Sequence, residues 1–264
     1  MMQLSDHATP VTDSGGSSPP LILLHGVGFD RLMWSATVPA LTSVHRVVTY
    51  DLRGHGGAAS APGAFTYERF AGDLSDLLDA LDLDRAHLAG LSFGGQVAQQ
   101  FALSFPERVE SLSLICTRAS PFEEFASAAE AAEREGLASY VEPALARWFS
   151  PEALAAGDPA VSYARECILG VSTVTWAACL RLIARFDVLD RLAEITAPTR
   201  VIAAGLDTVA TPRHMDEIAA RISGASFHVV DGGRLLLCFE RHAELAALLR
   251  SPERAPQWRE IDVR

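Results

Sequence analysis

The chain has 264 residues, of which 49% are hydrophobic and 21% are charged, so it can bury a substantial core. This composition excludes a mainly disordered protein. The formal net charge is -11 and no cluster of Lys or Arg offsets it, which argues against nucleic acid and anionic membranes as partners. The sequence shows no secretory signal, no apolar run long enough to span a membrane and no CxxC pair among its four cysteines, so a cytoplasmic location is predicted.

Strands and helices alternate over the first part of the chain, after a turn-rich lead at residues 8–20. Short apolar runs bounded by glycine or turn residues predict buried strands, and apolar residues at helical spacing predict helices. The predicted strands are 21–25, 45–51, 86–92 and 111–117, and the predicted helices are 67–82 and 94–106. This alternation predicts an α/β fold with a mostly parallel central sheet and helices on both faces.

From residue 120 to residue 190 the pattern is helical throughout, which predicts an inserted helical cap. The alternation then resumes with strands at 199–205 and 226–233 and with helices at 212–222 and 242–250. The predicted organisation is therefore a core sheet in residues 1–119, a helical cap in 120–190 and the rest of the core in 191–264. The polar segment 251–264 is expected to be a loosely held tail.

A glycine-flanked serine follows the predicted strand 86–92. Residues 90–94 read Gly-Leu-Ser-Phe-Gly and match G-x-S-x-G, a pattern that holds a serine on a sharp, strained turn between a strand and a helix. The loop 25–28 reads His-Gly-Val-Gly and follows the first strong strand. We expect the backbone N–H groups of Val27 and Phe93 to form an oxyanion hole beside Ser92. Plain glycine turns are the alternative for both segments.

These motifs resemble those of the α/β-hydrolase superfamily, over nearly the whole chain outside the helical segment. The resemblance is carried by LILLHGVG, VTYDLRGHG, AHLAGLSFGGQVAQQFAL, PERVESLSLI and VIAAGLDTVATP. In detail the chain is most similar to the 3-oxoadipate enol-lactonase branch. The resemblance implies an eight-strand type of sheet with short first strands, and a helical cap over the site. It also implies that Asp207 is the triad acid, with a turn aspartate that caps the helix near Pro212 as the alternative.

The family's triad histidine is expected in the segment DGGRLLLCFE, where this chain has none. When Asp231 and Glu240 are matched to the family pattern, Leu235 stands at the histidine position. The nearest histidines, His228 and His242, do not fit the register of that pattern.

A buried Asp207 without an imidazole beside it needs another partner. Arg234 adjoins the histidine position, and an arginine fork is the best match for a buried carboxylate. We therefore expect Arg234 to pair with Asp207.

The missing histidine leaves three functions open. Loss of a triad member costs about 10³- to 10⁶-fold in rate in well-studied serine proteases, so the leading hypothesis is non-hydrolytic chemistry. An oxyanion hole also stabilises an enolate, which favours proton transfer next to a carbonyl by an epimerase, isomerase, cyclase or lyase. Among superfamily members with degraded triads, the chain is similar in this respect to the peptide epimerase of the bottromycin pathway. The alternatives are a small ester or lactone hydrolase with a rearranged base, and a non-catalytic ligand-binding pseudo-hydrolase.

The cap is expected to cover a largely apolar pocket for a small-molecule or peptide natural product. The predicted wall residues, for each of which plain core packing is the alternative, are Trp34, Trp148, Phe149, Trp176, Cys179, Ile183 and Phe186. No cluster of His, Cys and Asp has metal-ligand spacing, and no dinucleotide-binding glycine motif occurs. Neither a metal nor a cofactor is therefore predicted.

Overall fold

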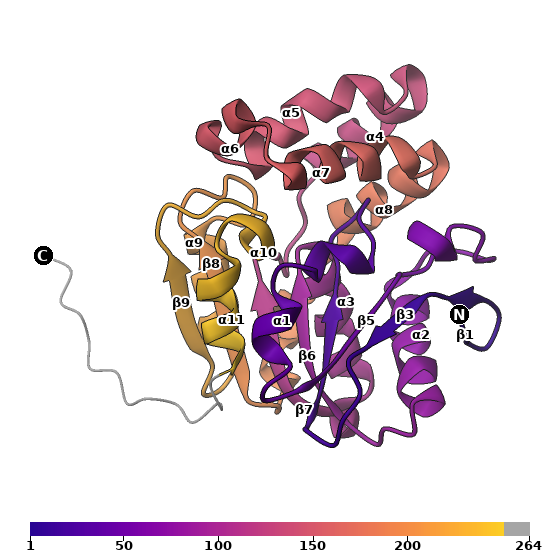
Figure 1. Cartoon of the computed structure of the whole chain (residues 1–264), viewed down its shortest axis with the longest axis vertical. Helices are drawn as coiled ribbons and strands as arrows, with labels where there is room; N and C mark the ends of the chain where they lie inside the picture. Colours follow the sequence, from indigo (N-terminus) through magenta and orange to yellow (C-terminus); the bar gives the residue numbers. More distant parts are fainter. Residues whose placement is uncertain (251–264) are drawn as a thin grey trace, which may run out of the picture.

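A seven-stranded sheet forms the centre of the computed structural model, which describes residues 1–250 (Figure 1). The strand order is β3-β5-β4-β6-β7-β8-β9; β3 pairs with β5 in antiparallel fashion and the other neighbours are parallel. A separate two-stranded sheet joins β1 to β2. The strands are β1 (Met2–Gln3), β2 (Ala8–Thr9), β3 (Val11–Asp13), β4 (Pro20–Leu24), β5 (Arg46–Tyr50), β6 (Ala86–Leu91), β7 (Val109–Ile115), β8 (Thr199–Ala204) and β9 (Ser226–Val230).

Helices flank this sheet, as the alternation predicted. One pair, α1 and α11, pack against each other, and α2 packs on α3, which lies on β6 and β7. The helices of the core are α1 (Val38–Leu41), α2 (Tyr67–Ala80), α3 (Phe93–Ser104), α9 (Pro212–Arg221), α10 (Leu237–Glu240) and α11 (His242–Arg250), with short 3-10 helices at Arg31–Trp34, Gly56–Ala58, Pro106–Arg108 and Leu189–Glu194.

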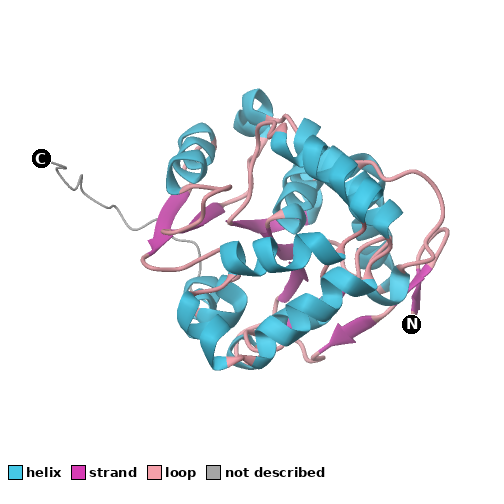
Figure 2. Ribbon diagram, turned by 90° about the horizontal axis from the view of Figure 1, so that it is seen from above, coloured by secondary structure: helices cyan, strands magenta, loops and turns pink. Residues whose placement is uncertain are grey.

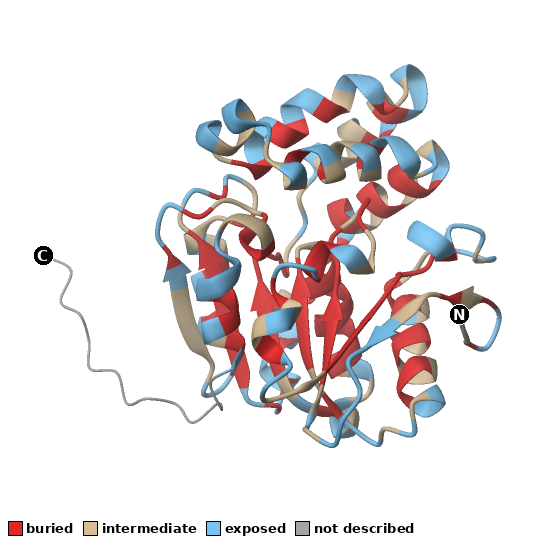
Figure 3. Ribbon diagram, in the orientation of Figure 1, coloured by how far each residue is buried: buried red, intermediate tan, exposed pale blue. Residues whose placement is uncertain are grey.

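Five helices between β7 and β8 form the helical insertion, here called the cap. They are α4 (Glu124–Glu135), α5 (Ala138–Trp148), α6 (Pro151–Ala156), α7 (Pro159–Gly170) and α8 (Thr173–Arg185). Figures 1 and 2 show the cap lying over one end of the sheet. Figure 3 shows that the central strands are buried, whereas the outer surfaces of the cap helices are exposed. Within residues 1–250 no single helix has the length and apolar character of a membrane span; α7 and α8 pass that test only together, bent by 101°.

The lead and the tail are where prediction and structure differ. The segment predicted to be a turn-rich lead contains β2 and β3, and the described sheet has seven strands where the resemblance implied an eight-strand type. Strands of two or three residues are too short to show a period of two, which explains why the sequence pattern missed them. The predicted tail at 251–264 lies outside the described residues.

The beginning of α3 lies so close to the end of β4 that side chains are excluded there. A Cβ atom on Gly94 would lie 2.4 Å from the carbonyl oxygen of Leu24, and one on Gly90 would lie 2.3 Å from that of Gly94. Because both neighbours are backbone atoms, neither can move without moving a strand or a helix. By contrast, a Cβ on Gly72, in the interior of α2, would meet no atom within 4 Å.

This contrast gives a matched pair of stability predictions. Gly94→Ala should lower the free energy of unfolding by several kcal/mol or prevent folding, because it forces β4 and α3 apart. Gly72→Ala should raise it by about 0.5–1 kcal/mol, because alanine is the better residue inside a helix. Urea unfolding of the two variants measures both effects, and a Gly94→Ala protein as stable as the wild type would contradict the close approach.

Candidate active site

A cavity lies between the cap and the carboxyl ends of the strands. The loops that follow β4, β6, β7 and β8 line it from the core, and side chains of α4, α5 and α8 line it from the cap. Ligands of open α/β sheets bind at this edge, where the strand ends and the helix starts meet. The cavity measures about 50 Å³, so a ligand of more than a few atoms requires lining side chains or the cap to move.

Ser92 lines this cavity at the junction of β6 and α3. Its backbone has φ 55° and ψ -115°, a conformation that non-glycine residues rarely adopt and that costs about 1–3 kcal/mol. Two hydrogen bonds hold the turn: the N–H of Ser92 donates to the carbonyl of Ile115 at 2.9 Å, and its carbonyl accepts from the hydroxyl of Thr117 at 2.7 Å. The predicted sharp serine turn is therefore present, with the serine at the cavity.

The loop after β4 is held rigidly beside Ser92. His25 is fully buried, and its Nε2 accepts from the N–H of Leu52 at 2.9 Å, so its Nδ1 carries the proton that is donated to the carbonyl of Gly26 at 2.8 Å. Burial lowers the pKa of His25 to about 4, which keeps this structural histidine neutral at physiological pH.

Val27 follows in the same loop and lines the cavity. Phe93 begins α3, so its N–H has no partner within the helix. An oxyanion hole formed by these two amides remains a prediction.

Asp207 also lines the cavity and is 7% exposed. Its Oδ1 accepts from the N–H groups of Val209 at 2.8 Å and Ala210 at 3.1 Å, but among the described residues no donor reaches its buried Oδ2. Burial raises the pKa of the Asp207 carboxyl above its ordinary value, whereas the two backbone N–H groups and the charges of Arg147 and Arg118 oppose that rise. The acid thus has one oxygen fixed and one without a partner.

Leu235 lines the cavity together with Ser92 and Asp207; that it stands at the family's histidine position remains a prediction. No histidine occurs among the described residues that line the cavity. His228 lies on the edge strand β9, and His242 begins α11 with its Nδ1 2.8 Å from the carbonyl oxygen of Phe239. Neither histidine lines the cavity; the absence of a histidine base remains a prediction.

The expected pair between Arg234 and Asp207 is wrong. Arg234 lies against the cap, where its Nη1 donates to the carbonyl of Ala146 at 3.3 Å, and it does not line the cavity. Its neighbour Leu235 lines the cavity, so the two adjacent side chains point in different directions: Arg234 toward the cap helix α5 and Leu235 into the cavity. Glu240 extends the contact with the cap, since its carboxylate accepts from the hydroxyl of Ser150 and, at 3.1 Å, from the N–H of Ser150.

Most of the residues that were predicted to line the cavity are instead packed in the core and do not line it. Trp148 and Ile183 line the cavity. The others are buried in the core away from it: Trp34, Phe149, Trp176, Cys179 and Phe186. For these five residues the alternative of core packing is the better description.

Two of these aromatic residues have a supporting contact that explains their position. Trp176 packs on Gly28, where a Cβ would lie 2.3 Å from its ring, so α8 rests directly on the loop after β4. Phe186 packs on Tyr67 with ring centroids 4.4 Å apart. Both rings support parts of the site without facing its cavity.

Several polar residues of the wall were not predicted from the sequence: Gln96, Thr117, Arg118, Tyr140, Arg147 and Thr208. The position of Gln96 could have been predicted, because it follows Ser92 by one turn of the predicted helix. Arg118 follows a predicted strand, which also placed it at the correct edge. Tyr140 and Arg147, joined by a hydrogen bond of 2.7 Å, belong to the cap, whose docking no local pattern reveals.

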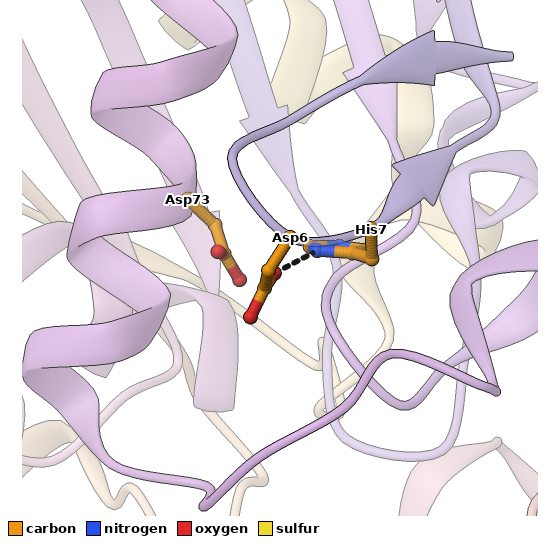
Figure 4. Close-up of side chains that lie close together, drawn as sticks. All are labelled: Asp6, His7 and Asp73. Carbon is orange, nitrogen blue, oxygen red and sulfur yellow. Dashed lines mark hydrogen bonds and ion pairs between the residues drawn. The ribbon is translucent and has the colours of Figure 1, made fainter.

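One cluster outside the cavity has the composition of a metal site. Asp6, His7 and Asp73 offer ligand atoms within 4.8 Å of one another (Figure 4). However, the buried guanidinium of Arg53 already lies between the carboxylates, 2.8 Å from Asp6 and 2.6 Å from Asp73, and its hydrogen bond to Asp6 holds the pKa of that carboxyl well below its usual range. The cluster fits an ion-pair network that ties the first hairpin to α2, and not a metal ion; the predicted absence of a metal stays a prediction.

The comparisons with known proteins agree with this geometry. A family model described as alpha/beta hydrolase fold matches residues 19–241. The 3-oxoadipate enol-lactonase 1 of Acinetobacter baylyi is 32% identical over 221 residues, which are 83% of this chain and 83% of that protein.

Solved structures give the same result. An enol-lactonase from Burkholderia xenovorans LB400 superposes with a TM-score of 0.88 at 27% identity, over 93% of this chain and 96% of that one. A thermophilic esterase from Thermogutta terrifontis superposes with a TM-score of 0.84 at 30% identity, over 92% and 91% of the two chains. Together with the serine turn at the edge of the sheet, these matches show that the chain belongs to the α/β-hydrolase-fold family.

Proposed function

We propose that the chain is an enzyme that opens a small ester or lactone at Ser92 with a base other than the family's histidine. The observation that carries this proposal is that Ser92, on its strained turn, and Asp207 line one cavity under the cap. The likeness to an enol-lactonase and an esterase supports the substrate class. This places the function with the hydrolytic alternative of the sequence analysis, ahead of its non-hydrolytic hypothesis.

Leu235 determines which esters suit such a site. In the usual triad the histidine first accepts the serine proton and then donates a proton to the leaving group. Leucine can do neither, and Asp207 is the one carboxylate among the described residues that line the cavity. An enolate or a phenolate is a weaker base than an alkoxide and can depart without a proton, so activated esters and enol lactones depend least on the missing acid.

A second candidate follows from the same two residues. Asp207 provides a carboxylate whose pKa is raised by burial and whose Oδ2 has no partner among the described residues, beside the apolar Leu235; this suits removal of a proton next to a carbonyl. The amides of Val27 and Phe93 would then stabilise an enolate. An epimerase, isomerase, cyclase or lyase acting on an apolar small molecule or peptide would use the site in this way.

Substrate turnover separates these functions. We expect wild-type protein to hydrolyse 4-nitrophenyl esters and an enol lactone, and Ser92→Ala to lose about 100-fold or more in kcat/KM. The same substrates in D₂O, followed by NMR, report exchange of the proton next to the carbonyl. Proton exchange without hydrolysis would favour the proton-transfer enzyme over the ester or lactone hydrolase. If neither exchange nor hydrolysis occurs, a ligand-binding pseudo-hydrolase is the function that remains.

Restoring the missing histidine is a direct test of the site's geometry. Leu235→His should raise the hydrolysis of 4-nitrophenyl esters by about 10-fold or more, because an imidazole would stand beside both Ser92 and the free oxygen of Asp207. The matched control is the same substitution combined with Ser92→Ala, which should abolish the gain. No gain in a folded Leu235→His protein would show that Ser92 and Asp207 do not have the relative placement of a triad.

The unpartnered oxygen of Asp207 predicts a pH-dependent stability. Because the pKa is raised in the folded state, the folded protein binds more protons than the unfolded chain once the pH exceeds the ordinary value of 3.8. Stability therefore falls as the pH rises from there through the raised pKa. Asp207→Asn lacks this titration, so its stability relative to wild type should increase as the pH rises. Urea unfolding between pH 4 and 8 measures the difference, which should grow with pH; a difference that is constant with pH would contradict the raised pKa.

A further inference from the structure

The amide group of Gln96 is oriented by a buried tyrosine. Gln96 is 2% exposed, and its Oε1 accepts a hydrogen bond of 2.6 Å from the hydroxyl of Tyr67. Tyr67 is itself buried, because its ring packs on Phe186 at 4.4 Å and on Phe93 at 5.7 Å. With its Oε1 turned to this hydroxyl, Gln96 has the donor Nε2 as its remaining polar side-chain atom.

This donor is available to a ligand. Gln96 lines the cavity, and among the described residues its Nε2 has no hydrogen-bond partner. The N–H of Gln96 donates to the carbonyl of Ser92 at 3.2 Å, so Gln96 follows Ser92 by one turn of the chain, and both residues line the cavity. A ligand whose carbonyl lies at Ser92 therefore has Gln96 within reach of an atom two to four bonds further along.

We propose that Gln96 forms a second acceptor subsite, which binds a neutral carbonyl oxygen in the acyl part of the ester or lactone, a few bonds from the carbonyl that reacts at Ser92. The inference rests on the proposed function for the identity of the reacting group. A neutral acceptor matches the subsite, because its donor is a neutral amide, whereas the cations that line the cavity are Arg118 and Arg147. The subsite selects keto-acyl substrates over simple acyl chains of the same length.

A pair of esters measures this selection. We expect wild-type protein to prefer 4-nitrophenyl 4-oxopentanoate over 4-nitrophenyl pentanoate by about 10-fold in kcat/KM, the size of one net hydrogen bond. Gln96→Leu should reduce this ratio to about 1.

Two further variants separate binding from structure. Gln100→Leu is the matched control, because Gln100 is a buried glutamine of α3 that lies outside the cavity and bonds to Ser104; it should keep the ratio. Tyr67→Phe keeps the ring packing and removes the hydroxyl that orients Gln96. It should lower the ratio through a higher KM for the oxo ester, with kcat on the pentanoate unchanged.

Binding without turnover keeps the subsite testable if no ester is hydrolysed. Calorimetry should show that wild-type protein binds hexane-2,5-dione about 10-fold more tightly than hexan-2-one. The Gln96→Leu variant should bind the two ketones with the same affinity. A preference that Gln96→Leu retains, or no preference in wild type, overturns the subsite. Failure of ester hydrolysis alone, with the ketone preference intact, overturns the proposed function and leaves the subsite standing.

Discussion

The close backbone contact between the end of β4 and the beginning of α3 is the constraint on which the site depends. Glycine at positions 90 and 94 lets α3 start against the last carbonyl groups of β4. Ser92 can adopt its strained conformation only because the segments on either side of it are held in this way. The same contact places Gln96 one turn after Ser92 and the loop after β4 beside both. A single packing arrangement therefore positions Ser92, the expected oxyanion donors and the amide of Gln96.

A second layer of aromatic residues keeps this arrangement rigid. Phe93 packs edge-on against Phe70 at 5.0 Å and also contacts Tyr67, which orients Gln96. Trp176 rests on the loop after β4. These rings support the site from behind, whereas other rings, among them Trp148 and Tyr140, face the cavity itself.

Local patterns predicted the fold well because the sheet's strands are apolar runs that end in glycine and its helices have regular apolar spacing. They also located Ser92, Asp207 and Leu235, since each follows a strand and therefore lies at one edge of the sheet. They failed where tertiary packing determines the direction in which a side chain points. Aromatic residues of the cap have the same spacing whether they face a cavity or the core, and the direction in which Arg234 points depends on how its loop meets the cap. The short strands β2 and β3 were missed because pairing with distant residues, and not their own sequence, makes them strands.

The contacts of Arg234 with Ala146 and of Glu240 with Ser150 have a consequence for motion. They attach the loop that carries Leu235 to the last turn of α5 and to Ser150 at the beginning of α6. A movement of these two cap helices would therefore also move this loop, so the shape of the cavity beside Leu235 depends on the position of the cap.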